Sequence, residues 1–205
     1  MKLYGFEFST NVERVQLALA HKGLKVEFIP VDPKDRSEVR RVSGQDLVPV
    51  IVDDGKVVAD SMEIVRYLEQ KHPSRPLYPE APERLAEMLI FIDWFNRVWK
   101  RPPNEIEAEM GKPTPDRARI ERLGRAMIDA LDLFEKMLTG REHLMGEFSA
   151  ADCCAFPFLK YGVLGTEPND AYLFHRVLVD WQPIKKDHPR LGEWIRRVDK
   201  RPRQA

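Results

Sequence analysis

The chain has 205 residues, of which 43% are hydrophobic and 32% are charged. This length allows one large domain or two small ones, and the composition suits a globular chain with a buried core rather than a disordered or collagen-like one. The chain has 33 lysine and arginine residues and 33 aspartate and glutamate residues, so the formal net charge is zero. The strong positive field of nucleic-acid-binding proteins is missing, and we expect no nucleic-acid partner.

The first 76 residues alternate strand and helix signals in the order βαβαββα. The predicted strands cover residues 2–6, 25–31, 48–52 and 56–59. The first two helices are predicted to end at Gly23 and Gly44, because glycine adopts the left-handed conformation that closes many helices. Asp53-Asp54-Gly55 is typical of a hairpin turn between the last two strands. Asp60 followed by Glu63 predicts a capping box at the start of a third helix.

Beyond residue 72 the pattern changes. The proline-rich stretch HPSRPLYPEAPE predicts a stiff linker, which we place at 77–84. All later signals are helical. The first long helix is predicted to end at Arg101-Pro102-Pro103, because proline breaks a helix interior. The next is predicted to end at Gly140, and shorter helices are predicted to start at Ser149, near 171 and at Pro189. The sequence therefore predicts an α/β domain at 1–76 and an all-α domain at 85–205.

Several signals are absent from the sequence. The chain has no charged and then apolar leader, and no apolar run near the roughly 18 residues needed to cross a bilayer, so we expect a cytoplasmic protein without a membrane partner. Cys153 and Cys154 are adjacent, which suits neither a disulfide framework nor a metal site, and we expect them in the core. The histidines show no metal-ligand spacing, so we expect no metal.

Three small polar residues, Ser9, Thr10 and Asn11, lie between the first strand and the first helix in FEFSTNVERV. One interpretation is a helix cap. A covalent nucleophile is excluded, because the loop has neither a histidine to act as base nor a G-x-S-x-G motif. The second interpretation is a hydroxyl that donates to a bound sulfur at the helix N-terminus, which lowers a thiol pKa from about 8.5 toward neutrality.

Two further dipeptides each allow two interpretations. Val48-Pro49 either begins an edge strand or forms a cis bond, a form found in about one X-Pro bond in twenty. Asp60-Ser61 is either an ordinary N-cap or a site for a group with two charges. Backbone amides and the Ser61 hydroxyl would hold its carboxylate, and Asp60 would accept from its ammonium.

The order of these motifs resembles the cytosolic glutathione transferase family, and the resemblance covers essentially the whole chain. The βαβαββα order with Val48-Pro49 and Asp60-Ser61 is similar to the thioredoxin-like N-terminal domain of that family. GEFSAADCCAFPFL, in which Ser149 and Asp152 form an S-x-x-D capping box, is similar to a core helix of the family's helical-bundle second domain. The stretch FSTNVERV is particularly similar to serine-type transferases of the phi class.

The resemblance implies a binding site for glutathione as co-substrate. It implies Ser9, or else Thr10, as the hydroxyl that activates the thiol, and Val48 before a cis Pro49 as the backbone partner of the cysteinyl part. Lys34, Arg36, Arg40 and Gln45 are the candidates for the glycine carboxylate, with Arg36 in the position of the phi-class basic pair. The implied glutathione contacts are Asn11, Arg36, Gln45, Val48, Pro49, Asp60 and Ser61.

The resemblance also implies an activity, the transfer of glutathione to a small hydrophobic electrophile, as in detoxification. The electrophile would lie in a cleft between the domains, against Phe6, Trp94 and Trp99. The family usually forms symmetric dimers, and the helix with Trp94 and Trp99 is apolar over more than one face, so we expect a homodimer. The alternatives are a non-catalytic scaffold of the same fold and a glutathione-dependent dehalogenase, isomerase or peroxidase.

Overall fold

The computed structural model describes residues 1–184 and 186–204, and it divides the chain into two compact units. The first, here called the α/β unit, comprises residues 1–79 and the C-terminal tail from Arg201. The second, the helical unit, comprises residues 80–200. The division between them falls within the segment 77–84 that we expected to be a linker.

The α/β unit contains a mixed sheet with the strand order β2-β1-β3-β4. The strands are β1 (Lys2–Gly5), β2 (Glu27–Pro30), β3 (Val50–Asp53) and β4 (Lys56–Ala59). β1 pairs in parallel with β2 and antiparallel with β3, and β3 pairs antiparallel with β4. Asp54 and Gly55, with φ of 50° and 83°, form the turn between β3 and β4, which confirms the predicted hairpin.

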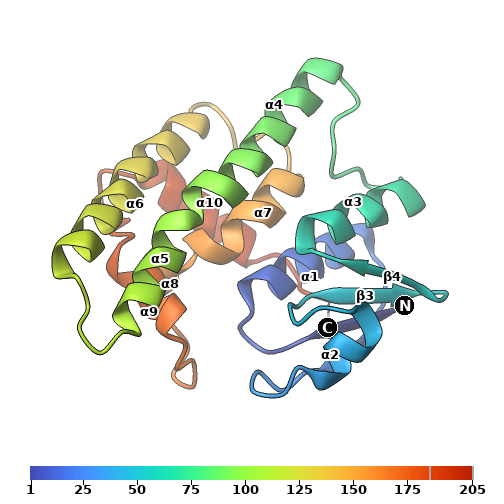
Figure 1. The fold of residues 1–205 in the computed structure, drawn as a ribbon. Helices are drawn as coiled ribbons and strands as arrows, with labels where there is room; N and C mark the ends of the chain where they lie inside the picture. Colours follow the sequence, from blue (N-terminus) through green and yellow to red (C-terminus); the bar gives the residue numbers. More distant parts are fainter. Residues whose placement is uncertain (185, 205) are drawn as a thin grey trace. The chain divides into compact units, whose positions relative to one another are not determined.

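Helices pack on both faces of this sheet. α1 (Thr10–Lys22) and α3 (Ser61–Lys71) lie together on one face, and α2 (Ser37–Ser43) lies on the other (Figure 1). Gly23 and Gly44 close α1 and α2 in the left-handed conformation, as predicted. The observed order βαβαββα confirms the thioredoxin-like fold. Its core includes the buried residues Leu3, Val15, Ala18, Leu19, Val39, Ile51, Ile64, Val65 and Leu68.

The C-terminal tail packs along α1. Nε and Nη2 of Arg203 donate to Oε1 of Glu13 at 3.1 and 2.9 Å, and the backbone N–H of Gln204 donates to the carbonyl of Gln16 at 3.2 Å. The domain prediction had grouped all residues from 85 to 205. The structure instead places the tail with the α/β unit, because these bonds join it to the first helix.

The helical unit has an aromatic core. Trp99 stacks on Phe95 with ring centroids 4.5 Å apart, and Phe134 and Phe158 meet the Phe95 ring edge-on at 6.1 and 5.7 Å. No helix within residues 1–184 and 186–204 is both long and apolar enough to cross a membrane. The α-helices of this unit are α4 (Pro82–Trp94), α5 (Arg101–Met110), α6 (Arg117–Met137), α7 (Ala150–Leu159), α8 (Tyr161–Leu164), α9 (Leu173–Asp180) and α10 (Pro189–Asp199).

The helical run that starts with α4 ends next to Arg101-Pro102-Pro103, as predicted, but another helix follows at once. α4 passes into a π-helical turn, η1 (Phe95–Trp99), and α5 then begins at Arg101 with both prolines in its first turn. Proline is tolerated there because the first N–H groups of a helix have no acceptor within the helix. The two prolines therefore mark the start of a helix that the sequence analysis missed.

The capping box at the start of α7 is confirmed. Oγ of Ser149 accepts from the N–H of Ala151 at 3.3 Å, and Oδ2 of Asp152 accepts from the N–H of Ser149 at 2.9 Å. Oδ1 of Asp152 also accepts from Nε1 of Trp194 at 2.7 Å. The capping carboxylate thereby links α7 to α10. Cys153 and Cys154, which follow it, are fully buried, as expected.

A tight contact in the helical unit gives a stability test. Gly124 in α6 lies so close to the Trp181 ring that an added Cβ would be 2.1 Å from Cε3 of that ring. Gly124→Ala should lower the free energy of unfolding by about 1–3 kcal/mol, because the large, half-buried ring of Trp181 must move. Gly111→Ala is the matched control, since its nearest atoms are 3.7 Å away. Urea denaturation measures both, and equal midpoints would contradict the packing described here.

Candidate functional site

The register of the sheet brings the candidate residues to one edge. Tyr4 pairs with Val50, Val50 pairs with Ala59, and Gly5 pairs with Pro30. β1, β2 and β4 therefore end where β3 begins, and the segments that leave these ends start side by side. Those segments carry Ser9, Arg36, Val48, Pro49 and Asp60, so residues far apart in the sequence converge at this edge.

Ser9 caps α1 and Thr10 is its first residue. Oγ of Ser9 accepts from the N–H of Val12 at 3.4 Å, and the Ser9 carbonyl accepts from the N–H of Glu13 at 2.9 Å. Ser9 is half-buried, whereas Thr10 is only 6% exposed. The cap bond uses Ser9 Oγ as an acceptor, so its hydroxyl proton can be donated to another atom. The helix-cap interpretation is thus confirmed. The cap bond is compatible with the second interpretation, in which the hydroxyl donates to a bound sulfur.

The bond between Val48 and Pro49 is cis, as the resemblance implied. Both residues are buried and precede the ladder of β3, which begins at Val50. The side chain of Gln45 holds the residue before them: Nε2 donates to the carbonyl of Leu47 at 2.8 Å, and Oε1 accepts from the N–H of Leu47. Gln45 therefore positions the approach to the cis bond through the backbone.

Asp60 is the N-cap of α3. Its Oδ1 accepts from the N–H groups of Met62 and Glu63 at 2.8 and 3.2 Å, and its φ of 72° is unusual for a residue with a side chain. The structure shows the Asp60 half of the predicted capping box, while the carboxylate of Glu63 pairs with Arg66. Because both cap bonds use Oδ1, Oδ2 of this exposed residue can accept from a cation.

Ser61, the first residue of α3, contacts a buried arginine. Nη1 of Arg14 donates to Oγ of Ser61 at 3.2 Å, and the two residues are 1% and 3% exposed. The oxygen of Ser61 is thus an acceptor toward α1, and its hydroxyl proton can point elsewhere. Sequence reasoning missed Arg14, because nothing in the α1 pattern separates a buried arginine from a solvent-facing one.

Phe6 and Arg36 contact each other. The Arg36 guanidinium lies 4.6 Å from the centroid of the Phe6 ring, and its Nε donates to the carbonyl of Pro33 at 3.0 Å. The contact joins the segments that follow β1 and β2. It places a positive charge beside an aromatic surface at the same edge of the sheet.

Arg40, an alternative partner for a carboxylate, already has one. Its Nε and Nη2 donate to the two carboxylate oxygens of Asp46 at 2.7 and 2.9 Å. Hydrogen bonding to Arg40 lowers the pKa of Asp46 below its usual range. This bidentate pair favours Arg36 over Arg40 as the residue that can bind a second anion.

The two tryptophans expected to contact a second substrate differ in exposure. Trp94 is half-buried, with its ring centroid 5.8 Å from that of Phe134. Trp99 is 3% exposed and belongs to the aromatic core. Its position in that stack gives Trp99 a packing role in the helical unit. In the described part of the chain, no group of three or more His, Cys, Asp or Glu side chains is arranged to hold a metal ion.

Comparison with known proteins agrees with this geometry. Residues 3–76 match the family model described as glutathione S-transferase, N-terminal domain. Glutathione S-transferase Z1 of Arabidopsis thaliana is 39% identical over 83 residues, which are 38% of this chain and 38% of that protein. A probable maleylacetoacetate isomerase of Caenorhabditis elegans is 36% identical over 87 residues, 41% of each chain.

A solved structure extends the likeness to both units. A glutathione S-transferase from Rhodospirillum rubrum F11 has a TM-score of 0.75 and 26% sequence identity, and the match covers 98% of this chain and 88% of that one. Residues 3–76 thus resemble the N-terminal domain of the glutathione S-transferase family, and the whole chain is similar in fold to a solved glutathione S-transferase. The chain spans well under half the length of the two curated relatives named here, 38% and 41%.

The cap of α3 provides a test that separates its two features. Asp60→Ala should lower the free energy of unfolding by about 1–2 kcal/mol, because it removes a carboxylate that accepts from two N–H groups and keeps the unfavourable positive φ. Asp60→Gly also removes the carboxylate but suits the backbone, so it should cost only a few tenths of a kcal/mol. Thermal unfolding of both variants compares them, and equal losses would show that the φ of Asp60 is unimportant.

Proposed function

We propose that this protein is a glutathione transferase, which binds glutathione at the sheet edge and directs its thiolate at an electrophile. The single observation that carries the proposal is the convergence at this edge of a hydroxyl at the N-terminus of α1, the cis Val48-Pro49 bond and the Asp60-Ser61 cap of α3. The match of residues 3–76 to the glutathione S-transferase N-terminal domain supports the same ligand.

The N-terminus of α3 suits the γ-glutamyl end of glutathione, which carries a carboxylate and an ammonium. The carboxylate would accept from the Ser61 hydroxyl, whose oxygen Arg14 already engages, and from the positive end of the helix. The ammonium would donate to Oδ2 of Asp60. The carboxylate of the ligand then meets hydrogen-bond donors, and its ammonium meets a carboxylate.

The other end of glutathione is a glycine carboxylate, and its partner is Arg36. This guanidinium lies over Phe6 at the same edge, whereas Arg40 is bound to Asp46. Gln45 contributes by holding Leu47, so that the backbone of Val48 is presented to the cysteinyl part. In this arrangement Gln45 is a positioning residue.

The thiol is activated by Ser9 or Thr10. A hydroxyl that donates to the sulfur stabilises the thiolate over the thiol, and the N-terminus of α1 adds positive potential. The greater exposure of Ser9 supports Ser9 as the donor, with Thr10 as the alternative. Asn11, in the first turn of α1, lies beside both.

The electrophile is proposed to be small and hydrophobic, with Phe6 and Trp94 as aromatic contacts. Trp99 contributes only through packing, since it lies in the aromatic core. We also propose a cytoplasmic homodimer. Exposed apolar side chains on α4 and η1 support association: Ile90 is 70% exposed, Val98 is 55% exposed and Leu89 is 45% exposed. Sedimentation analysis of the purified chain tests the dimer.

A glutathione-dependent isomerase is the second candidate, and the name of the Caenorhabditis elegans relative favours it. An isomerase also needs a bound thiolate, so the two reactions share the site proposed above. Glutathione-agarose retention separates both enzymes from a scaffold without glutathione binding. Parallel assays with maleylacetoacetate and with an activated aryl halide then separate isomerisation from conjugation.

Ser61→Ala tests the γ-glutamyl site. The variant should bind glutathione roughly tenfold to a hundredfold more weakly, because a hydrogen bond to a charged group is lost. Calorimetric titration measures the affinity. The same substitution removes an acceptor of the buried Arg14, so urea denaturation must show that the variant is folded at the assay temperature. Wild-type affinity in a folded variant would refute this placement.

Ser9→Ala tests the activation of the thiol. The pKa of the bound glutathione thiol should rise by roughly one to two units, because the hydrogen bond that stabilises the thiolate is lost. Each pKa unit corresponds to about 1.4 kcal/mol of preference for the thiolate. The transfer rate at neutral pH should then fall tenfold or more and recover in part at higher pH. Ultraviolet absorbance of the bound thiolate against pH is the measurement.

Thr10→Ala is the parallel variant for that experiment. A shift in the titration for Thr10→Ala but not for Ser9→Ala would assign the donor to Thr10. A curve unchanged in both would mean that the polar cluster only caps α1, and the proposed mechanism would lose its thiol-activating group.

A further inference from the structure

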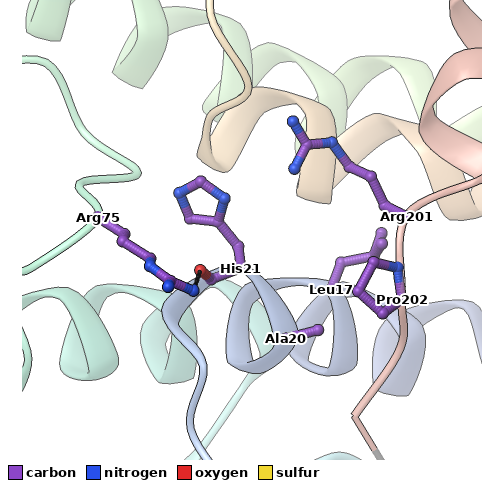
Figure 2. A pocket seen from close by; sticks show the side chains of 6 residues that line it. All are labelled: Leu17, Ala20, His21, Arg75, Arg201 and Pro202. Carbon is purple, nitrogen blue, oxygen red and sulfur yellow. Dashed lines mark hydrogen bonds between the residues drawn. The ribbon is translucent and has the colours of Figure 1, made fainter.

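A cavity of about 260 Å³ lies beside the C-terminal half of α1, in the α/β unit (Figure 2). It is at the other end of α1 from Ser9 and Thr10, so it is separate from the candidate glutathione site. Its walls come from α1, from the segment after α3 and from the C-terminal tail. The lining residues are Leu17, Ala20, His21, Arg75, Arg201 and Pro202.

The lining has basic but no acidic side chains. Figure 2 shows the imidazole of His21 between the side chains of Arg75 and Arg201. Burial lowers the pKa of His21, and the charge of Arg201 lowers it further, with a smaller effect from Lys22. The backbone carbonyls of Pro76 and Arg75 accept hydrogen bonds from His21 and partly offset this effect. Burial first, and then the neighbouring positive charge, thus disfavour protonation of His21.

Separate contacts hold the backbone of the segments that carry the two arginines. On one side, Nζ of the buried Lys22 pairs with Glu69 at 2.6 Å and donates to the carbonyls of His72 at 2.8 Å and Arg75 at 3.4 Å. On the other side, Arg203 and Gln204 bind α1 directly after Arg201 and Pro202. The walls of the cavity are therefore preorganised, which reduces the entropy lost when a ligand binds.

We propose that this cavity binds a small phosphate-type oxyanion. A guanidinium presents planar N–H donors that match the oxygens of a phosphate, and two of them border the cavity. Nη1 of Arg75 donates to the carbonyl of His21 at 3.3 Å, which uses one of the five N–H groups of that side chain. The apolar surface of Leu17, Ala20 and Pro202 limits access of water to the bound ion.

Binding is coupled to the protonation of His21. An anion beside the imidazole favours its charged form and raises the pKa of His21 from its lowered position. The anion therefore binds more tightly as the pH falls through that pKa, and binding takes up a proton. Among the described residues that line the cavity, His21 carries the imidazole, the side chain that ordinarily titrates nearest to neutral pH.

Inorganic phosphate is the probe for this site. Resonances of the His21 ring are followed by NMR against pH for the full chain, in phosphate and in chloride of matched ionic strength. Phosphate should raise the pKa of His21 by about half a unit or more and should saturate at millimolar concentration. Identical titration curves in the two salts, or a shift that does not saturate, would overturn the proposal.

Substitutions assign the effect to the cavity. Arg75→Gln and Arg201→Gln should each weaken phosphate binding roughly tenfold, because each removes charge-assisted hydrogen bonds. Arg201→Lys keeps the charge and should retain part of the affinity. Arg125→Gln, on the exposed face of α6, is the matched control and should bind as the wild type does.

Two outcomes separate this site from the rest of the protein. Glutathione affinity should be unchanged in Arg75→Gln and Arg201→Gln, so the phosphate site can fail while the proposed transferase stands, and the reverse also holds. Equal weakening by Arg125→Gln would show a nonspecific effect of net charge and would contradict the proposal. Urea midpoints of the variants confirm that each is folded during the titration.

Discussion

The antiparallel pairing of β1 with β3 is the constraint on which the candidate site depends. Tyr4 opposite Val50 fixes the point at which α1 begins relative to the cis bond at Pro49. β4 pairs with β3 after the tight turn between them. The pairing of Val50 with Ala59 then fixes the position of Asp60, the next residue, relative to the same cis bond. A slip of one residue in this ladder would turn each side chain of β3 to the other face and remove the convergence of these segments.

α1 is held in this arrangement by three buried or partly buried charges, each with a partner outside α1. Arg14 donates to Ser61 of α3, Glu13 accepts from Arg203 of the tail, and Lys22 pairs with Glu69 near the end of α3. An unpaired charge is costly to bury, so these contacts favour one orientation of the helix over others. The same helix contributes its N-terminus to the candidate glutathione site and its C-terminal half to the cavity with Arg75 and Arg201.

The arrangement explains why ligand and reaction are separate questions for this family. In the proposed function, the groups at the sheet edge would recognise charged ends, a backbone and a sulfur, which suits one thiol co-substrate. The proposed electrophile would contact aromatic surface with little directional chemistry, such as that of Phe6. One thiolate site can therefore serve conjugation or isomerisation, and the second substrate determines the outcome.

The sequence by itself determined the order of elements in the α/β unit, the closing glycines of α1 and α2, the Asp54-Gly55 turn and the capping box of α7. Each of these follows from residues a few positions apart, whose local preferences agree with the fold. The resemblance implied the cis bond at Pro49, because the motif order around it carried more information than the proline alone.

Tertiary structure decided the rest, because it depends on residues far apart in the chain. Directly after the predicted helix end, the prolines at 102 and 103 lie in the first turn of α5, and the preceding π-helical turn places Phe95 and Trp99 in the aromatic core. Arg14 is buried because Ser61 offers it an acceptor 47 positions away. The tail joins the α/β unit because Arg203 finds Glu13 across 190 positions, and no local pattern encodes a contact of that range.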